Sequence, residues 1–270
     1  MIPKTIHYCW FGRNPKPKLA EKCIKSWKKY CPDYEIIEWN EDNYDISAAP
    51  LYVRQAYEAK KWAFVTDYVR FDILYQYGGL YFDTDVEIIK PIDDILSRGA
   101  FMGCEKNSDY TNGAVGVAPG LGIAANPGLG IYREILDSYS EDSFINEDGS
   151  YNYKTIVERT TKILVKHGLK SEPRIQNVDG INVYPTDYFC PIDFRTGQMQ
   201  KTKNTRAIHW FSASWHDEET KRKMKEQQKK MKEQQKARKR DNLIHLPNRI
   251  AICILGQKKY DRLKKALKHE

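Results

Sequence analysis

The chain of 270 residues is long enough for one large α/β domain, or for a domain with an appendage, and for a substantial core. Its beginning lacks the apolar stretch of a signal peptide, and it contains no run of about 18 apolar residues, so we expect neither secretion by that route nor a membrane span. The six cysteines form no Cys-x-x-Cys pair and no zinc-binding spacing. In a chain of this length they are typical of reduced thiols in a cytosolic protein, which argues against a disulfide-stapled scaffold.

The formal net charge of +8 is unevenly distributed along the chain. Residues 219–270 contain 18 Lys and Arg against 6 Asp and Glu, whereas residues 1–218 contain 26 against 30. The basic character therefore belongs to the C-terminal part. We expect a catalytic domain over residues 1–218 and a basic, helical extension over residues 219–270.

The first forty residues predict a strand, a helix and a second strand. Residues 4–11 alternate apolar and polar side chains, Lys18–Tyr30 has apolar residues at helical spacing, and residues 34–39 are again β-prone. This order is typical of nucleotide-binding α/β proteins, in which ligands lie at the carboxyl ends of strands. Trp10, at the exit of the first strand, is either a core residue or a flat surface for a nucleotide base.

A helix predicted over residues 62–77 leads into the most informative part of the sequence. It is rich in aromatic and aliphatic residues, and it follows another predicted helix over residues 51–61. Gly78 and Gly79 stop the second helix, because glycine enters the left-handed conformation of a helix end without a Cβ clash.

Two acidic residues come directly after this stop. An apolar strand over residues 80–82 precedes Asp83 and Asp85, and β-prone residues continue over residues 86–89. Mg²⁺ and Mn²⁺ prefer oxygen ligands and usually share them with the phosphates of a substrate. The Asp-x-Asp pair in this context therefore predicts a site for a metal and a diphosphate, although the bare motif is common by chance.

A second charged pair lies on the helix before the motif. Asp67 and Arg70 are three positions apart, among apolar residues. One interpretation is an ordinary helix salt bridge, which contributes about 0.2–0.5 kcal/mol. We favour a functional pair, because charges on an apolar helix are costly to bury without a partner or a role.

The rest of the body predicts short strands and two helices. The strands are expected over residues 100–105, 113–117, 181–184 and 207–211, and the helices over residues 128–139 and 151–166. Asn112 stands before a glycine and is either a turn residue or a site residue. His209, in the last strand, is either structural or a ligand.

The C-terminal extension contains the one repeat of the chain. The seven residues 223–229 recur without change as residues 230–236, and one Met per repeat cannot make the apolar seam of a coiled coil. Residues 243–267 set apolar side chains among Lys and Arg, a pattern typical of an amphipathic segment on an anionic membrane surface. The alternative is a helix that packs back on the domain.

Several stretches together resemble one family of enzymes. The chain is similar to the DXD-type sugar transferases of bacterial capsule and exopolysaccharide loci, which are related to yeast mannosyltransferases and to clostridial glucosylating toxins. The similarity spans roughly residues 1–216 and is carried by residues 2–12, 64–85 and 208–215. It implies a GT-A fold, an α/β architecture with a Rossmann-like mixed sheet, which binds a metal-bound nucleotide sugar.

The resemblance also implies roles for particular residues. Trp10 would stack on the base, with uracil expected, and Asp67 and Arg70 would bind hydroxyl groups of the donor sugar and take part in catalysis. Asn112 would approach the sugar at the reaction centre. The other implied contacts are Tyr81 and Asp83 to the nucleotide sugar, Asp83, Asp85 and His209 to the metal, and Ser214 and Trp215 to the diphosphate.

The function implied by the resemblance is transfer of a hexose or N-acetylhexosamine from a nucleotide sugar, with UDP-hexose expected, to a saccharide acceptor. Mn²⁺ or Mg²⁺ would be the cofactor, and the acceptor would be a lipid-linked oligosaccharide of capsule or exopolysaccharide synthesis. The enzyme would be cytoplasmic and would meet the inner face of the cell membrane through its basic extension. Transfer would retain the anomeric configuration, by attack on the donor's own face with help from the leaving phosphate.

Two other classes of function remain open from the residues. An Asp-x-Asp-x-Thr phosphatase also places two acids after an apolar strand, with the first as nucleophile, but Glu87 stands here where that motif has Thr. A nucleic-acid binder would need only the basic extension to neutralise phosphates. The extension lacks interleaved aromatic residues, so we expect no nucleic-acid partner.

Overall fold

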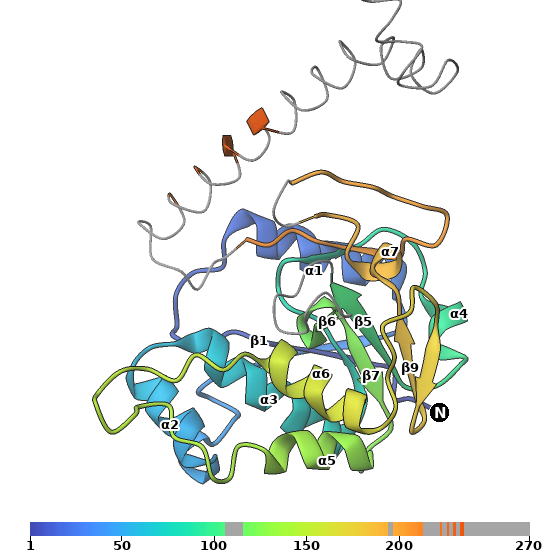
Figure 1. Cartoon of the computed structure of the whole chain (residues 1–270). Helices are drawn as coiled ribbons and strands as arrows, with labels where there is room; N and C mark the ends of the chain where they lie inside the picture. Colours follow the sequence, from blue (N-terminus) through green and yellow to red (C-terminus); the bar gives the residue numbers. More distant parts are fainter. Residues whose placement is uncertain are drawn as a thin grey trace, which may run out of the picture. The chain divides into compact units, whose positions relative to one another are not determined.

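Figure 1 shows the computed structural model of the chain. It describes residues 1–105, 116–193 and 197–212, together with six isolated positions between residues 222 and 234. The chain divides into two compact units, one of residues 1–194 and 198–216 and the other of residues 195–197 and 217–270. The strands and helices named below with a Greek letter all belong to the first unit.

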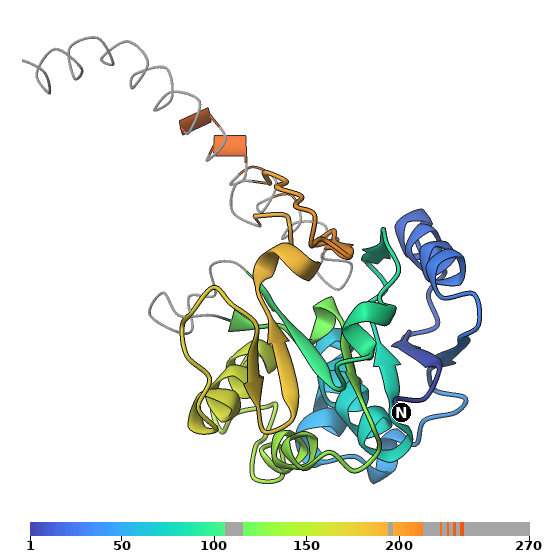
Figure 2. The same ribbon diagram turned by 90° about the vertical axis from the view of Figure 1, so that its right-hand side faces the viewer.

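A mixed β-sheet lies at the centre of the first unit. Its eight described strands are β1 (Thr5–Cys9), β2 (Glu35–Trp39), β3 (Gly79–Tyr81), β5 (Phe101–Glu105), β6 (Gly116–Val117), β7 (Ile123–Ala125), β8 (Gln176–Val178) and β9 (Ile181–Tyr184). They follow the order β2-β1-β3-β7-β5-β9-β8, with β6 paired to β5. β1 runs parallel to β2 and β3, whereas β7 runs antiparallel to β3 and β5. In Figure 2 the blue strands of the N-terminal part and the gold strands around residue 180 lie at opposite sides of the sheet.

Helices cover both faces of this sheet (Figure 1). One apolar core joins the sheet to α2 (Leu51–Glu58), α3 (Trp62–Tyr77), α5 (Gly130–Asp137) and α6 (Ile156–Lys166). A second core, on the other face, joins it to α1 (Lys18–Tyr30), α4 (Asp93–Leu96) and α7 (Thr186–Phe189). Because side chains alternate along a strand, Leu80 enters the second core and Tyr81 the first.

A separate two-stranded sheet pairs β4 (Val86–Ile88) with β10 (Ala207–His209) in antiparallel orientation. Helix α1 packs against this small sheet. Its buried residues Ala20, Cys23 and Trp27 recur at helical spacing, and the Trp27 Nε1–H donates to the Val86 carbonyl O at 2.7 Å. The small sheet is thereby attached to the main one through α1.

The end of α3 shows why the glycine pair is needed. Gly78 has φ +66°, and its N–H donates to the Leu74 carbonyl O at 2.9 Å, which closes the helix. A Cβ at Gly78 would lie 2.9 Å from the Ala125 carbonyl O. The chain can therefore turn from helix into β3 only with glycine at this position.

The α/β class with a mixed central sheet is confirmed, and α1 and α3 span the residues predicted for them. The helix predicted over residues 51–61 ends earlier, at Glu58. The prediction of a helix from residue 151 is wrong: residues 151–155 are not helical, and α6 begins at Ile156 because the Thr155 side chain caps it by accepting from the Glu158 N–H. The elements that were not predicted, α4, α7, β7 and β8, have only three or four residues each. Residues 113–115 of the predicted strand 113–117 lie outside the described residues.

Two expectations about the whole chain concern membrane spans and cysteines. Among the described helices, none is both long enough and apolar enough to cross a membrane. Five of the six cysteines are described, and each of these five is buried and outside any disulfide.

Candidate functional site

The small sheet brings three of the predicted site residues together. Asp83 follows β3, Asp85 precedes β4, and the pairing of β10 with β4 places His209 opposite Val86. The Trp210 N–H also donates to the Asp85 carbonyl O at 3.0 Å. A residue from the end of the domain is thus held beside the Asp-x-Asp motif by backbone pairing.

Asp85 has contacts to both of its carboxylate oxygens. Oδ1 lies 3.1 Å from His209 Nε2, and Oδ2 accepts from the Ser212 N–H at 2.8 Å. Burial by itself raises the pKa of Asp85, but His209 and the Ser212 N–H outweigh burial and hold that pKa well below its usual range. Asp85 is therefore ionised, as a metal ligand must be.

His209 shares this buried environment, with 15% of its side chain exposed. Burial lowers the pKa of His209, but the Asp85 carboxylate opposes burial and leaves that pKa above its ordinary value. Its Nδ1 is buried and has no hydrogen-bond partner among the described residues. The imidazole is thus oriented by one nitrogen only, the Nε2 that faces Asp85.

Asp83 is tied to both α3 and β3. Its Oδ1 accepts from the Tyr81 hydroxyl at 3.0 Å and lies 3.2 Å from Arg70 Nη2. Its Oδ2 lies over Gly120, in the short 3-10 helix η3 (Pro119–Leu121), where an added Cβ would be 2.1 Å from that oxygen. Only glycine at this position leaves room for the Asp83 carboxylate.

Arg70 is buried between two carboxylates. Its Nη2 lies 2.9 Å from Asp67 Oδ1 as well as near Asp83, and its Nε donates to the Thr66 carbonyl O at 3.0 Å. Burial lowers the pKa of Arg70, but the charges of Asp83 and Asp67 outweigh burial and keep that pKa above its ordinary high value. Burial raises the pKa of Asp67 to about 6, and Arg70 limits the rise. The pair is therefore more than a local helix salt bridge, because Arg70 also reaches the Asp-x-Asp motif.

The three clustered residues fit a divalent cation. Asp83, Asp85 and His209 each offer one ligand atom, and these atoms lie within 4.8 Å of one another. The two carboxylates suit Mn²⁺ and Mg²⁺, and His209 Nε2 would bind such an ion in place of its contact with Asp85, after losing its proton. The structure thus brings the three predicted ligands together, and their role as metal ligands stays a prediction.

Trp10 lies at the carboxyl end of β1 and is half-buried against the second core. Its Nε1–H donates to the Asn14 carbonyl O at 2.6 Å, and Lys16 Nζ lies 6.0 Å from its ring. The Gly12 N–H donates to Glu41 Oε1 at 2.7 Å and holds the following turn. The indole is thus neither a fully buried core residue nor a free side chain.

The structure leaves part of the predicted site undescribed and adds other residues to it. Asn112, Ser214 and Trp215 lie outside the described residues. Gly120 and Glu105, which no sequence signal indicated, belong to the surroundings of the cluster. Burial raises the pKa of Glu105, and His209 opposes the rise, which places its carboxylate in the field of that imidazole.

Comparisons with known proteins find one matching family and several relatives that match part of the chain. Residues 17–102 match the family described as the glycosyltransferase sugar-binding region containing a DXD motif. Inositol phosphoceramide mannosyltransferase 3 of Schizosaccharomyces pombe is 32% identical over 123 residues, which cover 44% of this chain and 34% of that protein. Initiation-specific alpha-1,6-mannosyltransferase of Candida albicans is 29% identical over 135 residues, which cover 47% of this chain and 33% of that protein. The chain spans about a third to a half of the length of the curated relatives that it matches.

Solved structures include two similar glycosyltransferases. The PaToxG glycosyltransferase has a TM-score of 0.43 at 19% identity, over 61% of this chain and 69% of that one. The galactosyltransferase LgtC, solved with donor and acceptor sugar analogues, has a TM-score of 0.41 at 14% identity, over 84% of this chain and 95% of that one. The Asp-x-Asp within the matched residues 17–102 is Asp83-Thr84-Asp85. Residues 17–102 of this chain are therefore similar to the DXD-containing sugar-binding region of glycosyltransferases.

Proposed function

We propose that this protein is a metal-dependent glycosyltransferase of the GT-A type that moves a hexose from a nucleotide sugar to a saccharide acceptor. The observation that carries the proposal is the cluster of Asp83, Asp85 and His209 beside a buried arginine that reaches Asp83. Mannose is the first hexose to test, because three of the fungal relatives are named mannosyltransferases.

The residues of the chain divide the work of binding and orientation. A Mn²⁺ or Mg²⁺ ion held by Asp83, Asp85 and His209 would neutralise the negative charge that develops on the departing diphosphate. Arg70 would donate to hydroxyl groups of the donor sugar, and Asp67 would accept from them, with both side chains fixed by their mutual contact. Trp10, half-buried at the end of β1, would offer its exposed part to the base.

The finer parts of the proposal concern stereochemistry and acceptor. We place the reaction among the retaining transferases, since the carboxylates of this cluster are engaged by Arg70, Tyr81 and His209 instead of flanking an open sugar site. The proposed acceptor is a lipid-linked saccharide of capsule or exopolysaccharide synthesis. The proposed location is the cytoplasmic face of the membrane, which the basic extension would contact.

A phosphatase of the Asp-x-Asp-x-Thr type fits these contacts less well. Its first Asp would have to attack phosphorus, yet Asp83 is bound by Tyr81 and Arg70 through the same oxygen. The fifth position is Glu87, which lies 2.7 Å from Lys22 Nζ and accepts from the Trp210 Nε1–H at 2.9 Å. Glu87 supports the small sheet and offers no hydroxyl group for phosphate.

The test is a screen for metal-dependent hydrolysis of nucleotide sugars. UDP- and GDP-linked hexoses, GDP-mannose among them, would be incubated with the full-length protein and Mn²⁺, and the released nucleotide diphosphate measured. Asp85→Asn should lower the rate by about 10² or more, because it removes a charged metal ligand and keeps an oxygen for the Ser212 N–H.

The matched control is Asp94→Asn, which removes an equally charged Asp that pairs with Arg206 away from the cluster. The control should hydrolyse the donor at the wild-type rate. Hydrolysis by Asp85→Asn at the wild-type rate, or a wild-type protein that turns over no nucleotide sugar in the screen, would contradict the proposed function.

A further inference from the structure

Two partly exposed tyrosines stand on the segment that precedes α6. Tyr151 and Tyr153 are 37% and 54% exposed, and their ring centroids are 5.9 Å apart. Tyr151 stacks on the buried Phe144 at 5.1 Å, and Tyr153 contacts Phe64 of α3 at 5.5 Å. We call Tyr151 and Tyr153 the aromatic platform. The donor-binding roles described above do not use it.

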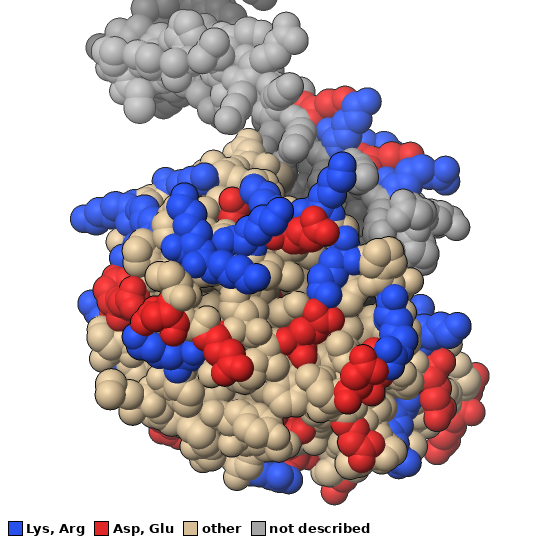
Figure 3. All heavy atoms as spheres, turned by 180° about the vertical axis from the view of Figure 1, so that it is seen from behind, with Lys and Arg blue, Asp and Glu red and all other residues tan. Residues whose placement is uncertain are grey.

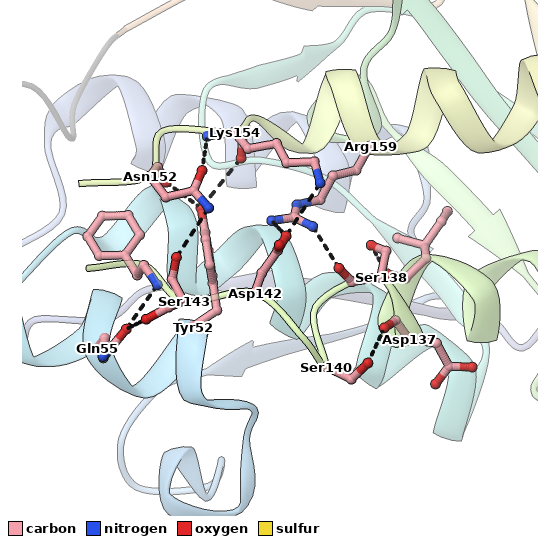
Figure 4. A network of polar contacts seen from close by, with 12 residues as sticks. Tyr52, Gln55, Asp137, Ser138, Ser140, Asp142, Ser143, Asn152, Lys154 and Arg159 are labelled. Atoms are coloured by element: carbon pink, nitrogen blue, oxygen red, sulfur yellow. Dashed lines mark hydrogen bonds and ion pairs between the residues drawn. The ribbon is translucent and has the colours of Figure 1, made fainter. Parts of the chain in front are cut away.

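A buried polar network holds the platform segment in place (Figure 4). The Arg159 side chain is 0% exposed and lies 2.5 Å from Asp142 Oδ2, and Lys154 Nζ reaches the same oxygen at 3.4 Å. The Tyr52 hydroxyl donates to the Asn152 carbonyl O at 3.0 Å. A segment anchored in this way loses little conformational freedom when it binds a ligand. The platform is therefore a fixed surface and not the tip of a loose loop.

A second anchor joins the loop before the platform to α2. Gln55 Oε1 accepts from the Phe144 N–H at 2.9 Å and from the Ile145 N–H at 3.1 Å. Ile145 also forms an isolated antiparallel bridge with Tyr151. The backbone on both sides of the platform is thus fixed to the helices of one core.

The platform segment runs along α3 toward Asp67. Tyr153 contacts Phe64, and three residues further along the segment the Ile156 backbone lies close enough to the Asp67 carboxyl to oppose the rise in its pKa. Phe64 and Asp67 are likewise three positions apart on α3. Three extended residues span at most about 11 Å, so the backbone of Tyr153 lies within that distance of the Ile156 backbone beside Asp67.

We propose that the aromatic platform is a subsite for the acceptor saccharide. The inference rests on the proposed function, in which Asp67 contacts the donor sugar and an acceptor sugar must lie next to it. The C–H groups on one face of a pyranose ring are attracted to the negative face of an aromatic ring. The two tyrosine rings lie at 76° to each other, so one can stack on a sugar while the other directs its edge and hydroxyl group toward it.

A neutral saccharide fits this surface better than a charged ligand. Among the described residues, Lys61 Nζ lies 5.5 Å from the Tyr151 ring, and Lys154 and Arg159 are both paired with Asp142. The surface thus offers flat aromatic faces and hydroxyl groups, with its buried charges already compensated. These are the contacts that a hydroxylated ring with an apolar face can make.

The test measures binding of saccharides to the full-length protein by saturation-transfer NMR, with mannobiose, lactose and cellobiose as probes. At least one probe should receive saturation in its ring protons from the wild-type protein. Tyr153→Ala should weaken its binding by about tenfold, and Tyr153→Phe should keep most of it, because the aromatic face remains.

Tyr77→Ala is the matched control. Tyr77 is 53% exposed at the far end of α3, where it stacks on Trp39 at 5.5 Å, so this variant removes an equally exposed ring and should bind the probe as the wild type does. Thermal unfolding of each variant would check that it is folded.

Two results would overturn the subsite: no binding of any of the three probes, or binding that Tyr153→Ala leaves unchanged. Hydrolysis of nucleotide sugars by the wild-type protein is measured separately and requires no acceptor. If hydrolysis is absent while saccharide binding depends on Tyr153, the proposed function fails and the binding site remains. If hydrolysis is present without such binding, only the subsite fails.

Discussion

Arg70 connects two parts of the candidate site that are separate in the sequence. It lies on α3 with Asp67, yet its Nη2 is 3.2 Å from Asp83, beyond the glycine stop and β3. The ring of Tyr81 lies beside Arg70, with its centroid 5.1 Å from the carbon of the Arg70 guanidinium. The same tyrosine donates to Asp83. One buried cation thus fixes the direction of the first carboxylate of the DXD motif.

Replacement of Gly120 should displace the Asp83 carboxylate, because Gly120 lies against its other oxygen, Oδ2. The Cβ of Gly120→Ala would lie 2.1 Å from Asp83 Oδ2 and 3.3 Å from Arg70 Nη1, so the carboxylate must move. We expect metal-dependent hydrolysis of the donor to fall by about 10–100-fold. The free energy of unfolding should fall by about 1–3 kcal/mol, because the site becomes overpacked.

The control for this change is Gly130→Ala, in α5. No heavy atom lies within 4 Å of a Cβ at Gly130, so the variant should keep its activity and lose no stability. Equal hydrolysis by the two variants would show that the space over Asp83 is not required.

His7 gives the fold a dependence on pH. Its Nδ1 accepts from the Trp39 Nε1–H at 3.0 Å and its Nε2 lies 3.0 Å from the Gly78 carbonyl O, so the neutral ring with a proton on Nε2 satisfies both contacts. Burial lowers the pKa of His7 to about 4, and the Gly78 carbonyl limits the fall. The unfolded chain, with a histidine pKa of about 6.5, therefore binds more protons than the folded one between these values.

We therefore expect the contribution of His7 to stability to be complete above pH 6.5 and to be lost as the pH falls toward 4. The loss should be at most about 3 kcal/mol. Urea unfolding of the wild type and of His7→Gln at pH 7.5, 5.5 and 4.5 measures it. The wild type should lose more stability than His7→Gln over this range, and parallel curves would contradict the assignment.

At the scale of elements, two short segments position the residues of the candidate site and of the aromatic platform. The β4–β10 pair brings His209 to Asp85, and the extended stretch before α6 brings the aromatic platform to α3. Both segments are too short to be stable by themselves. The small sheet depends on α1, and the platform segment depends on the buried ion pair between Arg159 and Asp142.

We expect the two partners of the Arg159–Asp142 ion pair to differ in how much their replacement lowers the free energy of unfolding. Asp142→Asn leaves a fully buried guanidinium without its carboxylate and should lower the free energy of unfolding by about 3–5 kcal/mol. Arg159→Met should cost less, because Asp142 is 27% exposed and keeps Lys154 as a partner. The double variant should be more stable than Asp142→Asn alone.

Urea unfolding of the two single variants and the double variant checks this order. A larger loss for Arg159→Met than for Asp142→Asn would mean that the guanidinium acts through packing on Tyr52 and Tyr139, whose ring centroids lie 5.1 and 4.1 Å away, more than through its charge.

At the scale of the whole molecule, positive charge gathers in two places. One is the extension over residues 219–270, which lies almost entirely outside the described residues. The other is α1, which exposes Lys18, Lys22, Lys25, Lys28 and Lys29. Figure 3 shows Lys and Arg gathering in the upper part of the rear face, where α1 lies, while both signs of charge mix below it.

We expect the extension to bring the protein to anionic membranes and to contribute nothing to the chemical step. Each Lys or Arg near an anionic surface contributes about 1 kcal/mol, and the apolar residues between 243 and 267 add buried area. A protein ending at residue 218 should hydrolyse the donor at a similar rate and should co-sediment much less with anionic liposomes. The lysines of α1 would account for weak residual binding.

Neutral liposomes and high salt are the controls for this experiment, since both should abolish binding of the full-length protein. If the extension instead packs on the domain, truncation should expose apolar surface, lower the melting temperature and reduce hydrolysis itself.

The sequence by itself determined the α/β class, most of the helices and the Asp-x-Asp motif. Local physics is sufficient for these features. The spacing of Ala20, Cys23 and Trp27 defines one face of α1, and the pair Gly78-Gly79 ends α3, whatever the rest of the chain does. The prediction of a helix over residues 151–155 was wrong, because contacts with α2 and α3 override the helical pattern there.

Only the tertiary structure decided which residues share the candidate site. The sequence left His209 as either structural or a ligand and offered no sign of Gly120 or of the platform. The position of His209 follows from the pairing of β10 with β4, and the role of Gly120 follows from the path of η3 over Asp83. The physical reason is that contacts between distant segments depend on strand pairing and helix packing, which the pattern of any single segment does not contain.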